Sequence, residues 1–225
     1  MSEAQDESNH APPECAEDEH RISIVEPFVL LVEGKDEYNF FDALQKHLRL
    51  PRIQLVNFEG RDNLQDVLEA VVKDSGFGTV VSLGIELDAN SDSQAAFDRI
   101  RGALQNPDLG VELPVPQRAL TPATGAVKVT GMVLPGEATR GSLEDLCLRA
   151  FSGNPEALCA DGFFECLTEQ NMPRPRQPSK AKMHVFLAAQ REFRKDLGWA
   201  AFQDYWPWGD SAFDQVKSFL REVAA

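Results

Sequence analysis

Three apolar runs alternate with three segments of helical periodicity between residues 27 and 104. The runs are 27–33, 52–58 and 78–88, and the helix-type segments that follow them are 35–48, 64–74 and 91–104. Runs that are apolar on both faces are typical of buried parallel strands, and parallel neighbours need a crossover between them, usually a helix. The pattern therefore predicts an α/β fold in which helices flank a parallel sheet on both faces.

The pattern continues beyond an irregular segment at 106–126 that is rich in proline and glycine. A fourth strand is predicted at 127–135, and a helix capped by Ser142 follows it. After a proline-rich linker, the periodicity predicts two more helices, at 180–197 and 211–223. The last third of the chain is therefore expected to be helical.

The N-terminal segment is strongly acidic. Residues 1–20 contain seven Asp and Glu residues and no Lys or Arg, which is half of the net charge of −14. A segment of this kind, with few large apolar side chains, is typical of a disordered tail. We therefore predict three parts: a disordered acidic tail (1–22), an α/β domain (26–152) and a small helical C-terminal extension packed on it (153–225).

Composition also excludes some classes of protein. No apolar run approaches the roughly 20 residues that a membrane helix needs, and the N-terminus lacks the basic start and apolar stretch of a signal peptide. The four cysteines show no spacing typical of structural zinc sites. The chain is expected to be cytoplasmic, with no membrane partner.

Two predicted strands end in carboxylates. Glu33 closes the first strand and Asp88 closes the third. Ligands of open parallel sheets bind beyond the carboxyl ends of the strands, so both side chains would face one cleft if the strands are neighbours. Hard oxygen ligands of this kind suit Mg²⁺ or Mn²⁺. The simpler interpretations are a carboxylate facing a helix N-terminus for Glu33 and a turn at 88–92 for Asp88.

A third acid is predicted on the same face as Asp88. Glu86 lies two residues earlier, so both side chains leave an extended strand on the same side. A charged residue inside a buried parallel strand needs a partner. The sequence leaves two partners open for Glu86: a metal ion shared with Glu33 and Asp88, or a Lys or Arg in a salt bridge.

At four places the chain resembles the Toprim domain family. The segments are VEGKDEYNFFDAL, FEGRDNL, LGIELDAN and MVLPGEATRGSLEDLCL, and KAKMHVFLAAQ resembles the C-terminal helix of one subgroup. That subgroup comprises small bacterial Toprim-like proteins, DUF3226-like, related to the nuclease half of the overcoming-lysogenisation-defect enzymes. The likeness runs from about residue 28 to residue 220. It implies a Toprim-like parallel sheet and a Mg²⁺-dependent nuclease.

The resemblance also implies roles for individual residues. Glu33 matches a glutamate that serves in metal binding and acid–base catalysis, and Asp88 matches the first aspartate of a metal-binding Asp-x-Asp. Asn90 stands where the second aspartate belongs, so one ligand is neutral. Glu144 matches a further acid of the subgroup, and it is also explained as an acid in a helix first turn. Lys35 is interpreted either as a phosphate contact or as a solvated side chain.

One segment reverses the acidic character of the chain. Residues 171–195 contain seven basic residues and one acid. They could guide a nucleic-acid backbone to the cleft through Lys180 and Lys182, or they could form an ordinary solvated helix face.

Three functions stay open on the sequence, and the chain is not settled as an enzyme. The first is a Mg²⁺- or Mn²⁺-dependent nuclease in which Glu33 and Asp88 are catalytic. The resemblance implies an ATPase partner for it and a role in phage defence. The second is a Toprim-shaped binding or regulatory module with a weakened Asp-x-Asn site. The third is phosphotransfer on a small nucleotide.

Overall fold

A computed structural model describes residues 22–190 and 196–225. Its centre is a four-stranded, all-parallel sheet with the strand order β2-β1-β3-β4. The strands are β1 (Phe28–Val32), β2 (Gln54–Asn57), β3 (Ser82–Asp88) and β4 (Lys128–Leu134). The sequence-based prediction of an α/β fold with a parallel sheet is confirmed.

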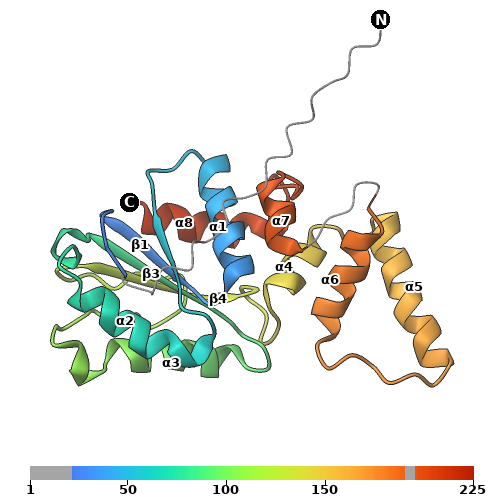
Figure 1. The fold of residues 1–225 in the computed structure, drawn as a ribbon, viewed down its shortest axis with the longest axis horizontal. Helices are drawn as coiled ribbons and strands as arrows, with labels where there is room; N and C mark the ends of the chain where they lie inside the picture. Colours follow the sequence, from blue (N-terminus) through green and yellow to red (C-terminus); the bar gives the residue numbers. More distant parts are fainter. Residues whose placement is uncertain (1–21, 191–195) are drawn as a thin grey trace, which may run out of the picture.

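Eight α-helices are present within the described residues (Figure 1). They are α1 (Lys35–His47), α2 (Leu64–Lys73), α3 (Ser93–Leu104), α4 (Leu143–Arg149), α5 (Pro155–Glu169), α6 (Pro178–Ala188), α7 (Leu197–Phe202) and α8 (Asp214–Val223). Short 3-10 turns are η1 (Arg61–Asn63), η2 (Phe77–Thr79), η3 (Pro107–Leu109) and η4 (Ser211–Phe213). None of the described helices is long and apolar enough to cross a membrane.

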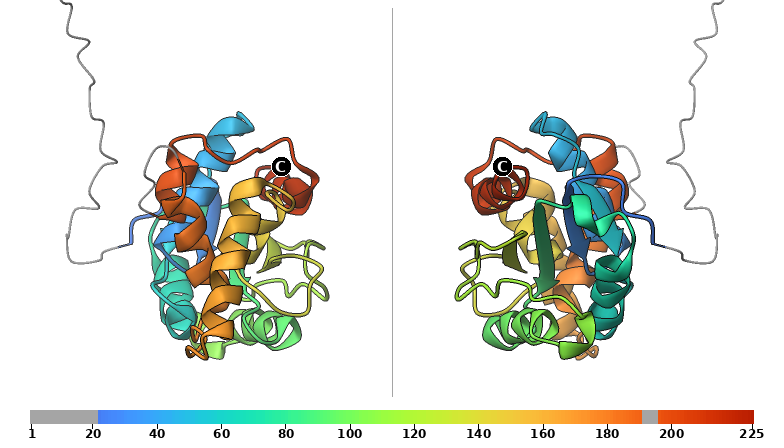
Figure 2. Two further views of the ribbon diagram at one scale, coloured as in Figure 1. Left: turned by 90° about the vertical axis from the view of Figure 1, so that its right-hand side faces the viewer. Right: turned by 90° about the vertical axis from the view of Figure 1, so that its left-hand side faces the viewer.

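Helices cover both faces of the sheet. In the two views of Figure 2, α1 and α8 lie on one side of the sheet, and α2 and α3 lie on the other. Successive side chains of each strand point to opposite faces of the sheet, so the strands contribute to two hydrophobic cores, one on each face. In β1, Leu30 and Val32 point into the α1–α8 core, whereas Val29 and Leu31 point into the α2–α3 core.

The C-terminal helices join the first of these cores. Phe40 and Phe41 of α1 pack in one buried cluster with Phe219 of α8 and with residues of α6 and α7. The paired helices α5 and α6 stand at the end of the molecule away from β1, as Figure 1 shows. The α/β part and the C-terminal helices α5, α6, α7 and α8 therefore share one hydrophobic core.

Several element boundaries differ from the sequence-based prediction. The third strand begins at Ser82 rather than residue 78, because Phe77–Thr79 form a 3-10 turn. From the sequence, Asp62 is also a candidate N-cap of the helix at 64–74, but it lies inside the 3-10 turn that precedes α2 and pairs with Arg99. The helix expected from residue 91 begins at Ser93, and Asp92 caps it by accepting hydrogen bonds from the amides of Gln94 and Ala95. The predicted tail, apart from Ile22, and three of the seven basic residues of the segment 171–195 (Arg191, Arg194 and Lys195) lie outside the described residues.

Both ends of the described chain lie at the amino edge of the sheet. The amide of Val25 donates to the side chain of Gln54, the first residue of β2. Near the other end, Lys128, the first residue of β4, forms an ion pair with Glu222. Ala225 follows three residues later.

Gly84 lies where the sheet packs against α8, and Gly102 is an exposed glycine that serves as its control. A Cβ added at Gly84 of β3 would lie 2.8 Å from Val223 Cγ2 and 2.9 Å from Leu30 Cδ1, whereas one at Gly102 of α3 would meet nothing within 4 Å. Gly84→Ala is expected to lower the free energy of unfolding by about 1–3 kcal/mol, because it overpacks the core. Gly102→Ala is expected to raise it by about 0.5–1 kcal/mol through helix propensity. Urea unfolding of both variants checks the opposite signs, and a stabilised Gly84→Ala would contradict the packing described.

Candidate metal-binding cleft

The strand order brings Glu33 and Asp88 together. Strands β1 and β3 are adjacent and in parallel register, although β2 lies between them in the sequence. The chain leaves β1 toward β2 on one side and returns to β3 on the other, which is the topological switch point where such sheets bind ligands. Glu33 Oε2 accepts a hydrogen bond from the amide of Asp88 at 3.1 Å. The expected proximity of the two strand-terminal carboxylates is therefore present.

A cleft of about 1100 Å³ opens above these two residues. Its walls are the start of α1, the loop at 140–142, the first turn of α4 and the segment that leads into α6. The acids that line it are Glu33, Asp36, Glu37, Asp88, Glu144, Asp145 and Asp196. The cations that line it are Lys35, Arg140, Arg176 and Lys180. The cleft is therefore strongly negative inside, with positive charge supplied by several long side chains.

Asp88 is held by the start of α4. Its Oδ1 accepts a hydrogen bond from the amide of Leu143 at 2.9 Å, and the helix N-terminus favours negative charge there. Burial nevertheless raises the pKa of Asp88 well above its usual range, and the charges of Glu37, Glu33 and Glu144 raise it further. Burial and the neighbouring carboxylates thus both disfavour the ionised form of Asp88.

Glu86 lies behind the cleft and is completely buried. Its Oε2 accepts from the amide of Glu33 at 3.3 Å, whereas its Oε1 has no hydrogen-bond partner in the described part of the chain. Burial raises the pKa of Glu86 well above its usual range, and Glu37 adds the largest repulsion. No Lys or Arg among the described residues forms a salt bridge with Glu86, and the structure therefore does not supply the cationic partner that one interpretation required.

Glu37 was not predicted from the sequence as a residue of the cleft. This residue lies in the first turn of α1 and lines the cleft. Burial raises its pKa to about 7, and Asp36, Glu144 and Glu33 contribute repulsion in that order. A signal was present in the sequence, because a helix that follows a parallel strand begins at the carboxyl edge. Acids in its first turn therefore reach the same cleft.

Asn90 and Glu144, the two further candidate ligands, both line the cleft. Asn90 has a left-handed backbone (φ 51°), a conformation for which Asn is enriched, and its amide and carbonyl pair with Gly141. Glu144 lies in the first turn of α4, where its Oε2 accepts from the Ser142 hydroxyl at 2.7 Å. The turn geometry alone explains the choice of Asn, so a ligand role for either residue stays a prediction.

Arg61 is a second residue near the cleft that was not predicted from the sequence. It follows β2, and its Nε lies 3.5 Å from Glu33 Oε1. Its terminal nitrogen donates to the carbonyl oxygen of Asp88 at 2.9 Å. The guanidinium therefore bridges the carboxyl ends of β1 and β3, the two strands that carry the predicted site.

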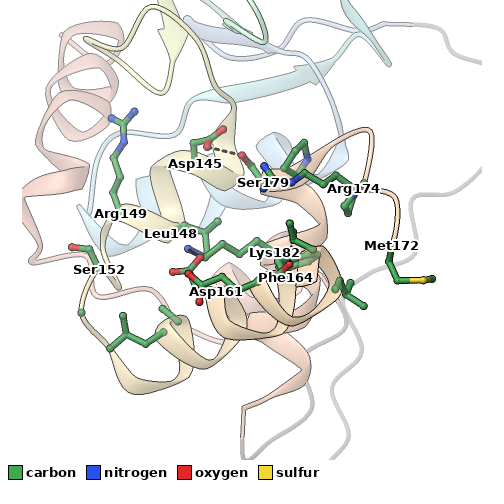
Figure 3. Close-up of a pocket in the computed structure, with 18 of the residues that line it drawn as sticks. Asp145, Leu148, Arg149, Ser152, Asp161, Phe164, Met172, Arg174, Ser179 and Lys182 are labelled. Atoms are coloured by element: carbon green, nitrogen blue, oxygen red, sulfur yellow. Dashed lines mark hydrogen bonds and ion pairs between the residues drawn. The ribbon is translucent and has the colours of Figure 1, made fainter. Parts of the chain in front are cut away.

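The structure separates the predicted nucleic-acid contacts. Lys35 and Lys180 are exposed and line the cleft, whereas Lys182 pairs with Asp161 at 2.5 Å and lines a second cavity of about 610 Å³. Figure 3 shows this second cavity, in which Lys182 and Asp161 lie near Leu148 and Phe164. The two cavities share a wall at Asp145 and Ser179, whose side chains are hydrogen-bonded at 2.6 Å.

The residues of the cleft offer oxygen donors to a divalent cation. The described residues contain no ready-made group of three His, Cys, Asp or Glu side chains around one point. Mg²⁺ does not require one, because it keeps several waters and is usually held by one or two carboxylates together with substrate phosphates. Glu33 and Asp88 supply hard oxygens, and the unpartnered buried oxygen of Glu86 lies behind them. The donor chemistry therefore fits Mg²⁺ or Mn²⁺.

Comparison with known proteins assigns a family to the chain. The model of the family described as "Protein of unknown function (DUF3226)" matches residues 27–225. The chain belongs to the DUF3226 family. The match covers the sheet, the cleft and the C-terminal helices of this DUF3226 protein, and it starts just after the acidic segment. No curated protein and no solved structure matched the chain.

Proposed function

We propose that the protein is a divalent-cation-dependent nuclease with a Toprim-like site that hydrolyses phosphodiesters in the cleft. The observation that carries the proposal is the meeting of Glu33 and Asp88 at the switch point of a parallel sheet, in a cleft of about 1100 Å³. The sequence resemblance to Toprim proteins supports the same assignment for these two positions.

Glu33 and Asp88 would hold Mg²⁺ or Mn²⁺. The bound cation would stabilise negative charge on a phosphoryl oxygen and promote attack by water. Glu33 would also accept the proton of the attacking water as the new phosphorus–oxygen bond forms and the leaving ester oxygen departs. The raised pKa values of Asp88 and Glu37 support this proposal. Repulsion between neighbouring carboxylates contributes to both shifts, and a bound cation would reduce that repulsion.

The cationic side chains of the cleft fit an anionic polymer. Lys35, Arg140, Arg176 and Lys180 line the cleft, although the whole chain has a net charge of −14. Lysine and arginine side chains neutralise backbone phosphates without reading sequence. We therefore expect binding that weakens steeply with salt and depends little on base sequence.

A second candidate function is a Toprim-shaped binding or regulatory module without cleavage. Asn90 favours this alternative, because it stands at the position where Toprim proteins carry a second aspartate and its left-handed turn is sufficient reason for its presence. A site with one fewer carboxylate has less charge with which to hold Mg²⁺. The two candidates differ in whether phosphodiesters are cleaved.

A calorimetric titration followed by a cleavage assay tests the proposal. Mg²⁺ and Mn²⁺ are titrated into the wild type, Asp88→Ala and the control Asp98→Ala, which removes an acid that is 53% exposed on α3. We expect binding in the wild type and the control, and loss of binding in Asp88→Ala. Cleavage of labelled single and double strands is expected to fall about 10²–10⁴-fold in Glu33→Gln.

The outcomes separate the two candidates. Metal-dependent cleavage that persists in Glu33→Gln and Asp88→Ala would place the activity outside this cleft and overturn the nuclease assignment. Metal and oligonucleotide binding without cleavage would favour the binding module.

A further inference from the structure

Arg61 is fixed in place by the loop that follows β2. The amide of Gly60 donates to the carbonyl of Glu33 at 2.8 Å, which ties this loop to the end of β1. Gly60 has a positive φ of 107°, and Glu59 before it has one of 54°. These contacts direct the Arg61 side chain back across the sheet edge, where it meets Glu33 and Asp88.

The guanidinium serves as the internal counter-ion of the cleft. Among the described residues, Arg61 is the one Lys or Arg that forms an ion pair with an acid lining the cleft, and that acid is Glu33. Its side chain is 32% exposed and that of Glu33 is 18% exposed, so solvent screens the pair only in part. Because both atoms of the pair belong to the protein, the contact exists before any ligand enters.

A divalent cation that binds Glu33 would compete with this ion pair. Glu33 Oε2 is already engaged by the amide of Asp88, and Oε1 is the oxygen that faces Arg61. A cation and a guanidinium cannot both lie against Oε1 without repelling each other. Once separated from Glu33, the guanidinium would present its N–H donors at the edge of the cleft. An arginine side chain can bind a phosphate group through two parallel hydrogen bonds.

We propose that Arg61 is a displaceable counter-ion: it neutralises Glu33 in the free protein, yields that carboxylate to the divalent cation, and then binds a phosphate of the nucleic acid. The inference rests on the proposed function, because it assumes that Glu33 holds the cation. It makes binding of cation and of nucleic acid mutually favourable, since each gains when Arg61 leaves Glu33.

Opposite effects of one substitution test this mechanism. Arg61→Gln is expected to bind Mg²⁺ and Mn²⁺ about five- to tenfold more tightly than the wild type in calorimetry without nucleic acid, because the competitor has been removed. The same variant is expected to bind a short fluorescein-labelled oligothymidylate in Ca²⁺ more weakly, with a salt slope reduced by about one.

Arg52→Gln is the matched control. Arg52 precedes β2 and Arg61 follows it, so the same charge is removed at the opposite end of one strand. The Arg52 side chain is 82% exposed and pairs with Glu26, away from the cleft. We expect its cation affinity and its oligonucleotide affinity to equal those of the wild type. Thermal unfolding of all three proteins with and without cation provides a second measure of metal binding.

The binding results for Arg61→Gln distinguish the counter-ion role of Arg61 from the proposed function. Tighter metal binding together with weaker oligonucleotide binding in Arg61→Gln alone supports the counter-ion role. Unchanged or weaker metal binding in Arg61→Gln, with clear binding in the wild type, overturns this inference and leaves the proposed function standing. No metal binding by the wild type, Arg61→Gln or Arg52→Gln overturns both.

Discussion

Without divalent cations, the free energy of unfolding is expected to fall as the pH rises from about 4.5 to about 8. Burial raises the pKa of Glu37 from 4.5 to about 7 in the folded protein. Between these values the folded state binds more protons than the unfolded state, so stability falls with rising pH. The stabilising contribution is complete below the unfolded pKa and is lost as the pH passes the folded one.

The size of this effect follows from the pKa shift. A shift from 4.5 to about 7 corresponds to about 3 kcal/mol for Glu37, and the raised pKa values of Asp88 and Glu86 act in the same direction. A protein of this length loses roughly 2–4 °C of unfolding temperature per kcal/mol. The unfolding temperature in EDTA is therefore expected to be lower by about 10 °C near pH 8 than near pH 5.

Circular dichroism melts across this pH range measure the effect. Glu37→Gln keeps the volume and removes the titration, so its unfolding temperature should depend less on pH than that of the wild type. Added Mg²⁺ should raise the unfolding temperature most at high pH, where the carboxylates are ionised. A wild-type stability that rises steadily from pH 5 to pH 8 in EDTA would contradict the burial of these acids.

Phe40→Ala is expected to lower the free energy of unfolding by about 3–5 kcal/mol. Phe40 is completely buried, and its ring centroid lies 5.4 Å from that of Phe41, 5.2 Å from that of Trp208 and 5.9 Å from that of Phe213. The substitution removes contacts between α1 and the segment before α8 and leaves a cavity between them.

Phe163→Ala is the matched control for this prediction. Phe163 lies on α5 and is 48% exposed, so its removal should change stability by less than about 1 kcal/mol. Urea unfolding should show one cooperative transition for both variants, because α1 and the C-terminal helices share a core. Loss of only the C-terminal helices in Phe40→Ala, with the sheet intact, would show that the shared core is not cooperative.

The order of strands and helices was predictable because each strand is apolar on both faces. In β3, Leu83, Ile85 and Leu87 fill one core, and Gly84 lies against the other. Such runs identify a parallel strand without tertiary information. Helix α5 was not singled out, because only Ala157 and Ala160 of its residues are buried and its periodicity is weak.

The part of the candidate site that lies directly at the ends of strands was predicted from the sequence. Glu33 and Asp88 come directly after apolar runs, and the topology then forces them together. Glu37 and Arg61 were missed because their role depends on the direction in which a helix turn or a loop sends the side chain. The direction of these side chains cannot be predicted from the local sequence of charges. For Arg61 it becomes visible only in the structure, where the side chain forms an ion pair with Glu33.

The position of the chain ends has a practical consequence for single-molecule and surface-based assays. Val25 contacts Gln54 and Glu222 contacts Lys128, so both ends of the described chain lie at the edge of the sheet opposite Glu33 and Asp88. A tether attached after Ala225 would hold the protein with its cleft facing the solution. The support would then not block the cleft, and the proposed cleavage of a long nucleic acid could be measured for the immobilised protein and compared directly with that of the free protein.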